Sequence, residues 1–209
     1  MARKKIIRQN QFPYHVYIRT NNRTWFNIPM HQMWDLTYEC LIYALKKRPV
    51  SLHAFVLMSN HYHMIVSTPD ANLDQFMEFF NRKLSQRINE LSRFKNHKFS
   101  NGYKWTIIDS NNYLYSIYRY VYQNPVKANL CKLCFDYPYS SLRFSPSQIK
   151  ELNLRPHLNY FKYRSWFEQA QSGEVNRTIG NGLTKTYFKI AKKTRINTRN
   201  CVESSPLNS

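Results

Sequence analysis

The 209-residue sequence is poor in glycine and in acidic side chains, with 4 glycines and 12 aspartates plus glutamates. It contains no glycine-rich loop of the kind that cradles the phosphates of a nucleotide, so we expect no nucleotide cofactor. Against the 12 acids stand 31 lysines and arginines, which give a net charge of +19 and a pI of about 9.9. This excess is larger than solubility alone requires, and it predicts a polyanionic partner such as a nucleic acid.

Cysteines are few, and long apolar runs are missing. The cysteines Cys40, Cys131, Cys134 and Cys201 do not suggest a disulfide framework. Cys131 and Cys134 have half of a zinc-site spacing without a second pair, so reduced thiols are the expectation. No run of about 18 apolar residues suggests a membrane span, and the basic start leads into a polar segment instead of an apolar signal sequence. We therefore expect no membrane partner and a cytoplasmic location.

Two histidines lie inside a predicted β-strand. The sequence His61-Tyr62-His63 is flanked by the apolar runs 55–58 and 64–66. Because side chains alternate along a strand, His61 and His63 must share one face while Tyr62 points to the other. Neutral imidazole is a common metal ligand, and two on a rigid strand can hold a divalent ion with positions left for substrate oxygens. The alternative is a solvated sheet face that binds no metal.

A predicted helix follows from Asn111 to Asn124, where Leu114, Ile117, Tyr118 and Val121 form one apolar stripe at helical spacing. Tyr120 and Asn124 lie one turn apart along the flank of this stripe. Pro125 disfavours helical geometry at Asn124, so the helix should stop there. Among 16 tyrosines, Tyr120 could be a packing residue, and Asn124 could simply end the helix.

Taken together, the strand and the helix resemble the single-tyrosine HUH transposases, and more narrowly the REP-associated tyrosine transposases and their IS200-like relatives. The matching segments are 58–66 and 120–128, together with 13–16, 19–23 and 137–141, so the resemblance covers roughly residues 10 to 145. Either half alone is a weak motif, because a His-x-His sequence is common. Both halves in this order, with a helical segment between them, make a specific match.

The resemblance implies roles for four residues. His61 and His63 match the metal-binding histidines, and Tyr120 matches the catalytic nucleophile. Asn124 matches the position that often completes the metal site, where relatives commonly have glutamine. The implied activity is cleavage and rejoining of single-stranded DNA through a 5′-phosphotyrosine, with recognition of a hairpin and with Mg or Mn as the divalent ion. Relatives work as a monomer or as a homodimer.

The chemistry of such a site follows from the residue types. Attack of a phenol on a phosphodiester needs a bound cation to polarise the non-bridging oxygens and a nucleophile positioned in line. A phosphotyrosine linkage preserves the energy of the broken bond, so rejoining needs no nucleotide triphosphate. Two alternatives remain open. One is a domesticated DNA-binding protein with the same fold and no turnover, and the other is a metal nuclease that uses water while Tyr120 is structural.

Several cations are candidates for binding the phosphate backbone. The predicted nucleic-acid-binding residues are Arg19, Arg23, Arg82, Lys83, Arg87 and Lys127. A basic tail is also expected to touch DNA, through Lys189, Lys192, Lys193, Arg195 and Arg199. Aromatic residues make up 16% of the chain and could include stacking platforms for unpaired bases. The remaining histidines have no matching partner spacing and are interpreted as structural or surface residues: His15, His31, His53, His97 and His157.

The predicted order of elements is β-α-β-β-α-β followed by the tyrosine helix. Strands are expected at 14–19, 50–58, 61–68 and 103–109, and helices at 30–46 and 73–91. This order is that of a ferredoxin-like α+β fold, a split βαβ with an antiparallel sheet backed by two helices. We expect a catalytic domain over residues 1–145 and, over 146–209, a helical extension with a partly ordered basic tail. Within the tail, a short helix is predicted at 185–193.

Overall fold

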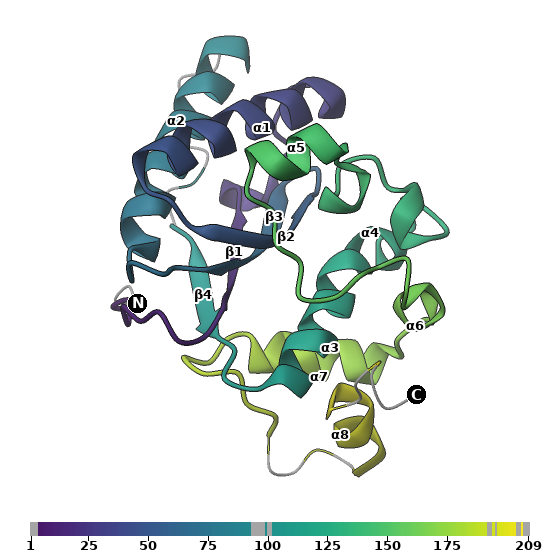
Figure 1. The fold of residues 1–209 in the computed structure, drawn as a ribbon. Helices are drawn as coiled ribbons and strands as arrows, with labels where there is room; N and C mark the ends of the chain where they lie inside the picture. The colour runs from purple at the N-terminus through teal and green to yellow at the C-terminus, as the bar shows by residue number, and fades with distance from the viewer. Residues whose placement is uncertain are drawn as a thin grey trace.

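A computed structural model describes residues 4–92, 99, 102–191, 194, 196–203 and 206 (Figure 1). The strands are β1 (Tyr14–Arg19), β2 (Ser51–Leu57), β3 (His61–Ser67) and β4 (Lys104–Ile107). The helices are α1 (Met30–Lys47), α2 (Leu73–Ser92), α3 (Asn111–Tyr122), α4 (Asn124–Lys127), α5 (Pro146–Glu151), α6 (Arg164–Glu168), α7 (Gly173–Gly182) and α8 (Ile196–Glu203). Short 3-10 turns are η1 (Asn21–Arg23), η2 (Cys134–Asp136) and η3 (Ser141–Arg143). Within the described residues, no helix has the length and apolarity needed to cross a bilayer.

The four strands form one antiparallel sheet in the order β2-β3-β1-β4. Each half contributes a strand, a helix and a strand, which is the predicted split βαβ arrangement. The ferredoxin-like α+β prediction is therefore confirmed. In the central pairing, Tyr17 lies opposite His63 and Arg19 lies opposite His61. This register brings the polar residues of two strands that are distant in sequence onto the same patch of the sheet.

The two faces of the sheet are covered by different helices (Figure 1). Helices α1 and α2 cover one face, where alternate β1 residues such as Tyr14, Val16 and Ile18 join their core. Helix α3 covers part of the other face through the predicted stripe of Leu114, Ile117, Tyr118 and Val121, all of which are buried. Their partners on the sheet are Ala54, Val56 and Ile65. The apolar contact is confined to the β2 side of that face, so the β1 side is free to carry polar groups.

Helix α3 ends before the predicted Asn124, about half a turn earlier. It stops at Tyr122 with Gln123 as C-cap, and Pro125 then occupies the first turn of the short helix α4. Proline is tolerated in a first turn because the missing N–H has no intrahelical partner there. The prediction that the tyrosine helix ends before the proline is confirmed, but the expectation that Pro125 keeps Asn124 out of helical geometry was wrong. The placement of Asn124 in the final turn of that helix was wrong, since Asn124 begins α4.

The C-terminal extension packs on both layers. Ser145 is the N-cap of α5 and forms a capping box with Gln148. Just after this helix, Leu152 and Leu154 join the core that contains the buried residues of α1. Helices α7 and α8 instead join the core around α3. The short helix predicted at 185–193 was wrong over the described residues 185–191. There the chain runs beside β4, with Phe188 N donating to Ile107 O at 2.8 Å.

The backbone N–H and C=O groups at the open edge of the sheet need hydrogen-bond partners, and this segment supplies them. A helix in the same segment would leave those edge groups unpaired. Part of the predicted basic tail, namely Lys192, Lys193 and Arg195, lies outside the described residues, as does His97. None of the cysteines Cys40, Cys131, Cys134 and Cys201 takes part in a disulfide.

Buried histidines predict a loss of stability in mild acid. His53 is almost fully buried on β2, where its Nδ1 donates to Arg155 O at 2.5 Å and its Nε2 accepts from Ser67 Oγ at 2.7 Å. Burial lowers its pKa to about 4. The unfolded chain takes up a proton near pH 6.5 and the folded chain does not, so stability is complete above that pH and is lost as pH falls towards 4.

A His53→Asn variant keeps a donor for Arg155 O and removes the titration. Between pH 7 and pH 5, its free energy of unfolding is expected to fall by roughly 2 kcal/mol less than that of the parent chain. Denaturant unfolding at the two pH values measures this, with His31→Asn, at an exposed position of α1, as the control. Equal losses in the parent and the His53 variant would contradict the assignment.

Candidate active site

The two histidines of β3 share one face of the sheet, as predicted. Tyr62 points into the helix layer, where its hydroxyl donates to Asn81 Oδ1 at 2.6 Å. His61 and His63 lie on the opposite face, with ring centroids 5.2 Å apart. His63 is 4% exposed and His61 is half-buried. Because both sit on a central strand of the sheet, their spacing is fixed by the backbone.

Tyr120 comes to this face from the last turn of α3. Its ring centroid is 6.0 Å from that of His63, with the two rings nearly perpendicular. The apolar stripe of α3 docks on the β2 side of the sheet, and that docking leaves the Tyr120 flank above the β1–β3 pair. Asn124 follows at the start of α4, and its Nδ2 donates to Tyr120 O at 2.8 Å. This leaves the carboxamide oxygen of Asn124 as the atom that can act as a ligand.

These four residues line one cavity of about 420 Å³. Its wall also includes His15, Tyr17, Arg19, Met58, Lys104, Lys127, Ala128, Gly180, Leu183 and Thr184. The structure therefore brings together the histidine pair, the tyrosine and the asparagine that the sequence singled out. Helix α7 closes one side of the cavity. Its Gly180 lies so close to Tyr120 that a Cβ atom at this position would be 3.8 Å from the Tyr120 hydroxyl oxygen.

Burial sets the protonation of the histidines. It lowers the pKa of His61 to about 4, with a further contribution from the positive charge of Arg19. Burial also holds the pKa of His63 well below its usual range, and the neighbouring His15 and His61 add to the effect. Both rings are therefore neutral at pH 7, which is the form that can bind a cation.

The phenol of Tyr120 is protonated at neutral pH. Burial raises its pKa, and Tyr17 raises it further, while the charge of Arg19 lowers it. A phenol in this state becomes a nucleophile only as its proton leaves during attack. Positive charge beside the hydroxyl favours the phenolate, so Arg19 acts in the right direction for such a step.

The donor set of the cavity fits a small divalent cation. It offers two neutral imidazole nitrogens, which are common ligands of divalent transition metals, and one amide oxygen, the donor type that Mg²⁺ and Mn²⁺ prefer, with phosphate oxygens or waters left to complete the shell. No cluster of three or more His, Cys, Asp or Glu side chains suited to a metal occurs among the described residues. Any metal bound here would therefore depend on a neutral oxygen donor such as Asn124 and on the substrate.

Three of the six predicted DNA-binding cations lie at or beside the cavity. Arg19 and Lys127 line it, and the Lys127 Nζ is 5.9 Å from the Tyr120 ring centroid. Arg23 lines an adjoining hollow of about 340 Å³ together with Arg19 and Lys104. The Nε of Arg19 is buried and has no hydrogen-bond partner within the described part of the chain. The cations that line the cavity and the adjoining hollow, which we call the positive rim, are Arg19, Arg23, Lys104 and Lys127.

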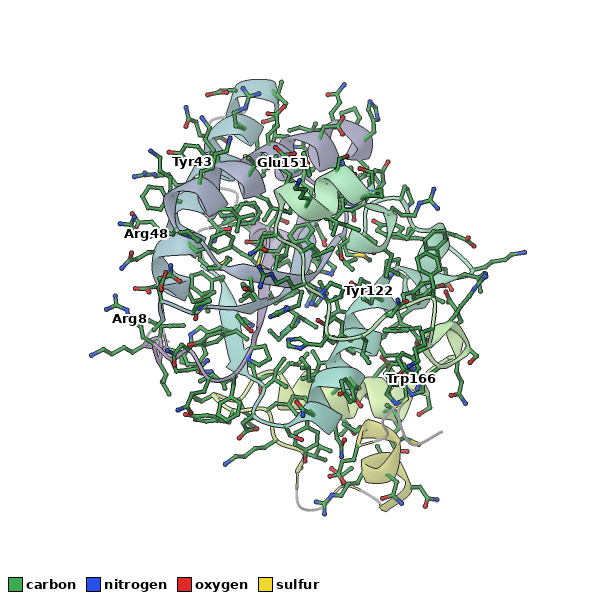
Figure 2. The ribbon with its side chains drawn as sticks, viewed as in Figure 1. Arg8, Tyr43, Arg48, Tyr122, Glu151 and Trp166 are labelled. Atoms are coloured by element: carbon green, nitrogen blue, oxygen red, sulfur yellow. The ribbon has the colours of Figure 1, made fainter. Side chains whose placement is uncertain are left out.

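The other three predicted cations, on α2, lie on the far side of the sheet. Arg87 pairs with Glu90 at 2.9 Å and with Glu39 at 3.6 Å. The Lys83 Nζ stands 5.6 Å from the ring centroid of Tyr43. Figure 2 shows Tyr43 on the outer helix layer, well away from Tyr122 on α3. The α2 cations are therefore not brought together with the histidine pair and Tyr120.

Sequence reasoning missed several residues of the cavity wall. His15 and Tyr17 alternate with Arg19 along β1, so strand periodicity alone places all three on one face. Pairing of β1 with β3 then sets Tyr17 against both histidines, at ring-centroid distances of 5.5 Å from His61 and 4.9 Å from His63. The contribution of α7 through Gly180 has no local signal, because it depends on how a distant helix packs.

Comparisons with known proteins show a family match and a similar fold. The family model described as "Transposase IS200 like" matches residues 8–124, a span that contains both histidines, Tyr120 and Asn124. A solved structure of a REP-associated tyrosine transposase bound to a REP hairpin is similar in fold, with a TM-score of 0.57 and 19% sequence identity. The match covers 82% of this chain and 93% of that one. No curated protein matches the chain.

Proposed function

Because the chain belongs to the IS200-like transposase family, we propose that it cleaves and rejoins single-stranded DNA through a covalent link to Tyr120. In this proposal His61, His63 and Asn124 hold a divalent metal, Mg or Mn. The observation that carries the proposal is the shared cavity, in which the Tyr120 ring lies 6.0 Å from the ring of a buried, neutral His63.

The cleavage step follows from the positions of these groups. The Tyr120 oxygen attacks the phosphorus, a Tyr120–phosphorus bond forms, and the bond from phosphorus to the 3′ oxygen breaks. The phenol loses its proton and the departing 3′ oxygen gains one, leaving a 5′-phosphotyrosine and a free 3′-hydroxyl. A divalent metal would polarise the non-bridging oxygens and offset the charge that builds up on them. Arg19 and Lys127 add fixed positive charge beside the same phosphate.

Rejoining is the reverse of this step. A 3′-hydroxyl attacks the phosphotyrosine and restores the Tyr120 phenol, so the number of phosphodiester bonds is conserved and no nucleotide triphosphate is consumed. The absence of a glycine-rich phosphate loop from the sequence agrees with this.

We infer that the DNA partner is a single strand presented with a hairpin. Support comes from the positive rim around the cavity, from the net charge of +19, and from the solved relative that holds a REP hairpin. A duplex stem beside an unpaired strand would place phosphates against Arg23 and Lys104 while one phosphate enters the cavity.

Salt dependence tests which cations contact the DNA. Replacing Arg19, Arg23, Lys104 or Lys127 with alanine is expected to weaken binding of a single-stranded oligonucleotide and to make the slope of log K against log salt shallower by about 0.7 per lost contact. Fluorescence anisotropy from about 50 to 300 mM salt measures both quantities. The matched controls are Arg82→Ala, Lys83→Ala and Arg87→Ala, which are expected to change the slope little. A larger effect at α2 than at the rim would move the DNA path to the helix layer.

We further propose that one chain is sufficient for the reaction. The histidine pair and Tyr120 come from the same chain, within a catalytic unit over residues 1–145, while residues 146–209 cover it through α7. A monomer therefore needs no partner to complete the site, and a homodimer would have to form without supplying these groups. Light scattering at the concentration used for cleavage distinguishes the two.

Two other functions use the same fold. A DNA-binding protein without turnover has no need of the histidine pair beside a tyrosine, and a water-using metal nuclease makes no covalent adduct. The test is to incubate the protein with labelled single strands from the flanks of its own gene and Mg or Mn, and to look for a denaturant-resistant protein–DNA band that a chelator abolishes. Binding without such a band, across several flanking strands, would favour one of the alternatives.

A further inference from the structure

Both histidines of β3 are held by a hydrogen bond at the Nδ1 atom. His63 Nδ1 lies 3.0 Å from His15 Nε2, and His15, on β1, is 3% exposed. His61 Nδ1 lies 2.7 Å from Asn60 Oδ1. The Asn60 carboxamide is itself fixed, because its Nδ2 donates to Arg23 O at 2.8 Å. Both Nδ1 atoms are thus occupied by side chains outside the predicted ligand set.

The chemistry of a neutral imidazole decides what these contacts do. Such a ring carries a proton on one nitrogen and a lone pair on the other. Asn60 Oδ1 can only accept, so His61 must carry its proton on Nδ1 and its lone pair on Nε2. In the second pair, His63 presents its Nε2 lone pair only if its Nδ1 donates and His15 Nε2 accepts. With the opposite direction, His63 would present an Nε2–H group, which cannot bind a cation.

We infer that His15 and Asn60 are positioning residues that hold the Nδ1 protons of His63 and His61, so that both rings present Nε2 lone pairs for a divalent cation. This inference rests on the proposed function, because it assigns roles around the metal site proposed there. Partners of this kind fix both the tautomer and the orientation of a ligand ring.

The burial of His15 supports a specific role over simple packing. A polar ring within a sheet costs free energy unless it has a partner, and its neighbours along β1, Tyr14 and Val16, belong to the core on the opposite face. A neutral His15 ring has one acceptor nitrogen, and its Nε2 lies 3.0 Å from His63 Nδ1, within hydrogen-bond distance. A leucine would fill the space but would leave the Nδ1–H of His63 unpaired.

The first test compares His15→Leu with His15→Gln. A glutamine side chain can reach the region of Nε2 with a carboxamide oxygen and accept the same proton. We expect His15→Leu to weaken Mn²⁺ binding by about 10- to 100-fold and His15→Gln to remain within a few-fold of the parent chain. Electron paramagnetic resonance titration of free Mn²⁺ measures the affinity without DNA or turnover. The control is Thr106→Val. Thr106 is a buried β4 residue that lies opposite His15 in the sheet, and its hydroxyl donates to Leu183 O and not to His15.

The second test reads the tautomers in the parent chain without metal. Long-range NMR correlations between imidazole protons and labelled nitrogens are expected to show the proton on Nδ1 in both His61 and His63. A proton on Nε2 of His63 would overturn the inference, because the ring would then present no lone pair to a cation. Equal Mn²⁺ affinity in a folded His15→Leu chain would also overturn it, while leaving the metal site intact. A parent chain that binds no Mn²⁺ would instead count against the proposed function, and the tautomers would still decide the roles of His15 and Asn60.

Discussion

A Tyr120→Phe chain is expected to lose DNA cleavage by at least about a thousandfold while it binds the same oligonucleotide within a few-fold of the parent affinity. The substitution removes only the atom that forms the covalent bond, and the ring that packs against His63 remains. No described hydrogen bond uses the Tyr120 hydroxyl, so the melting temperature should change little. Gel assays of labelled strands measure cleavage, and anisotropy measures binding.

The control for this variant is Tyr115→Phe, which removes a hydroxyl from a partly buried tyrosine on the same helix that lies outside the cavity wall. It should cleave at the parent rate. Cleavage that survives in Tyr120→Phe would mean that water attacks the phosphate, and the chain would then be a metal nuclease in which Tyr120 is structural.

The second large effect is expected at the histidine pair. Replacing His61 or His63 with alanine should weaken Mn²⁺ binding and reduce cleavage by at least about a hundredfold, because each variant removes one of two nitrogen donors on a rigid strand. Binding of DNA without metal should persist, since it depends on the cations of the rim. Calorimetric titration with Mn²⁺ and cleavage at saturating metal separate lost affinity from lost rate.

His31→Ala, at an exposed position on α1, is the matched control and should leave both quantities unchanged. Because His63 is buried, its alanine variant needs a thermal unfolding curve, and His63→Gln provides a second variant with less lost volume. Parent-like Mn²⁺ affinity in folded variants of both histidines would show that the cavity is not the metal site.

Much of the fold could be predicted because its signals are local. The alternation of His61, Tyr62 and His63 fixed their faces, and the stripe on α3 fixed which side of the helix meets the sheet. The break before Pro125 followed from the chemistry of proline, although the chain then begins a new helical turn instead of leaving helical geometry.

What could not be predicted depends on contacts between distant segments. His15 has no partner spacing in the sequence, and only the pairing of β1 with β3 brings it to His63. DNA binding by Arg82, Lys83 and Arg87 was predicted from helical periodicity alone. That periodicity shows that these side chains avoid the core, but it does not show on which side of the sheet their helix lies. The cover over Tyr120 comes from α7, more than fifty residues further along the chain.

The most direct test of the central claim is peptide mapping by mass spectrometry of the protein after incubation with its flanking single-stranded DNA and Mn²⁺. Nuclease trimming of the DNA followed by proteolysis should yield one modified peptide, with a phosphate-linked nucleotide remnant on Tyr120. A remnant on another residue, or cleaved DNA with no modified peptide, would contradict the assignment of Tyr120 as the nucleophile.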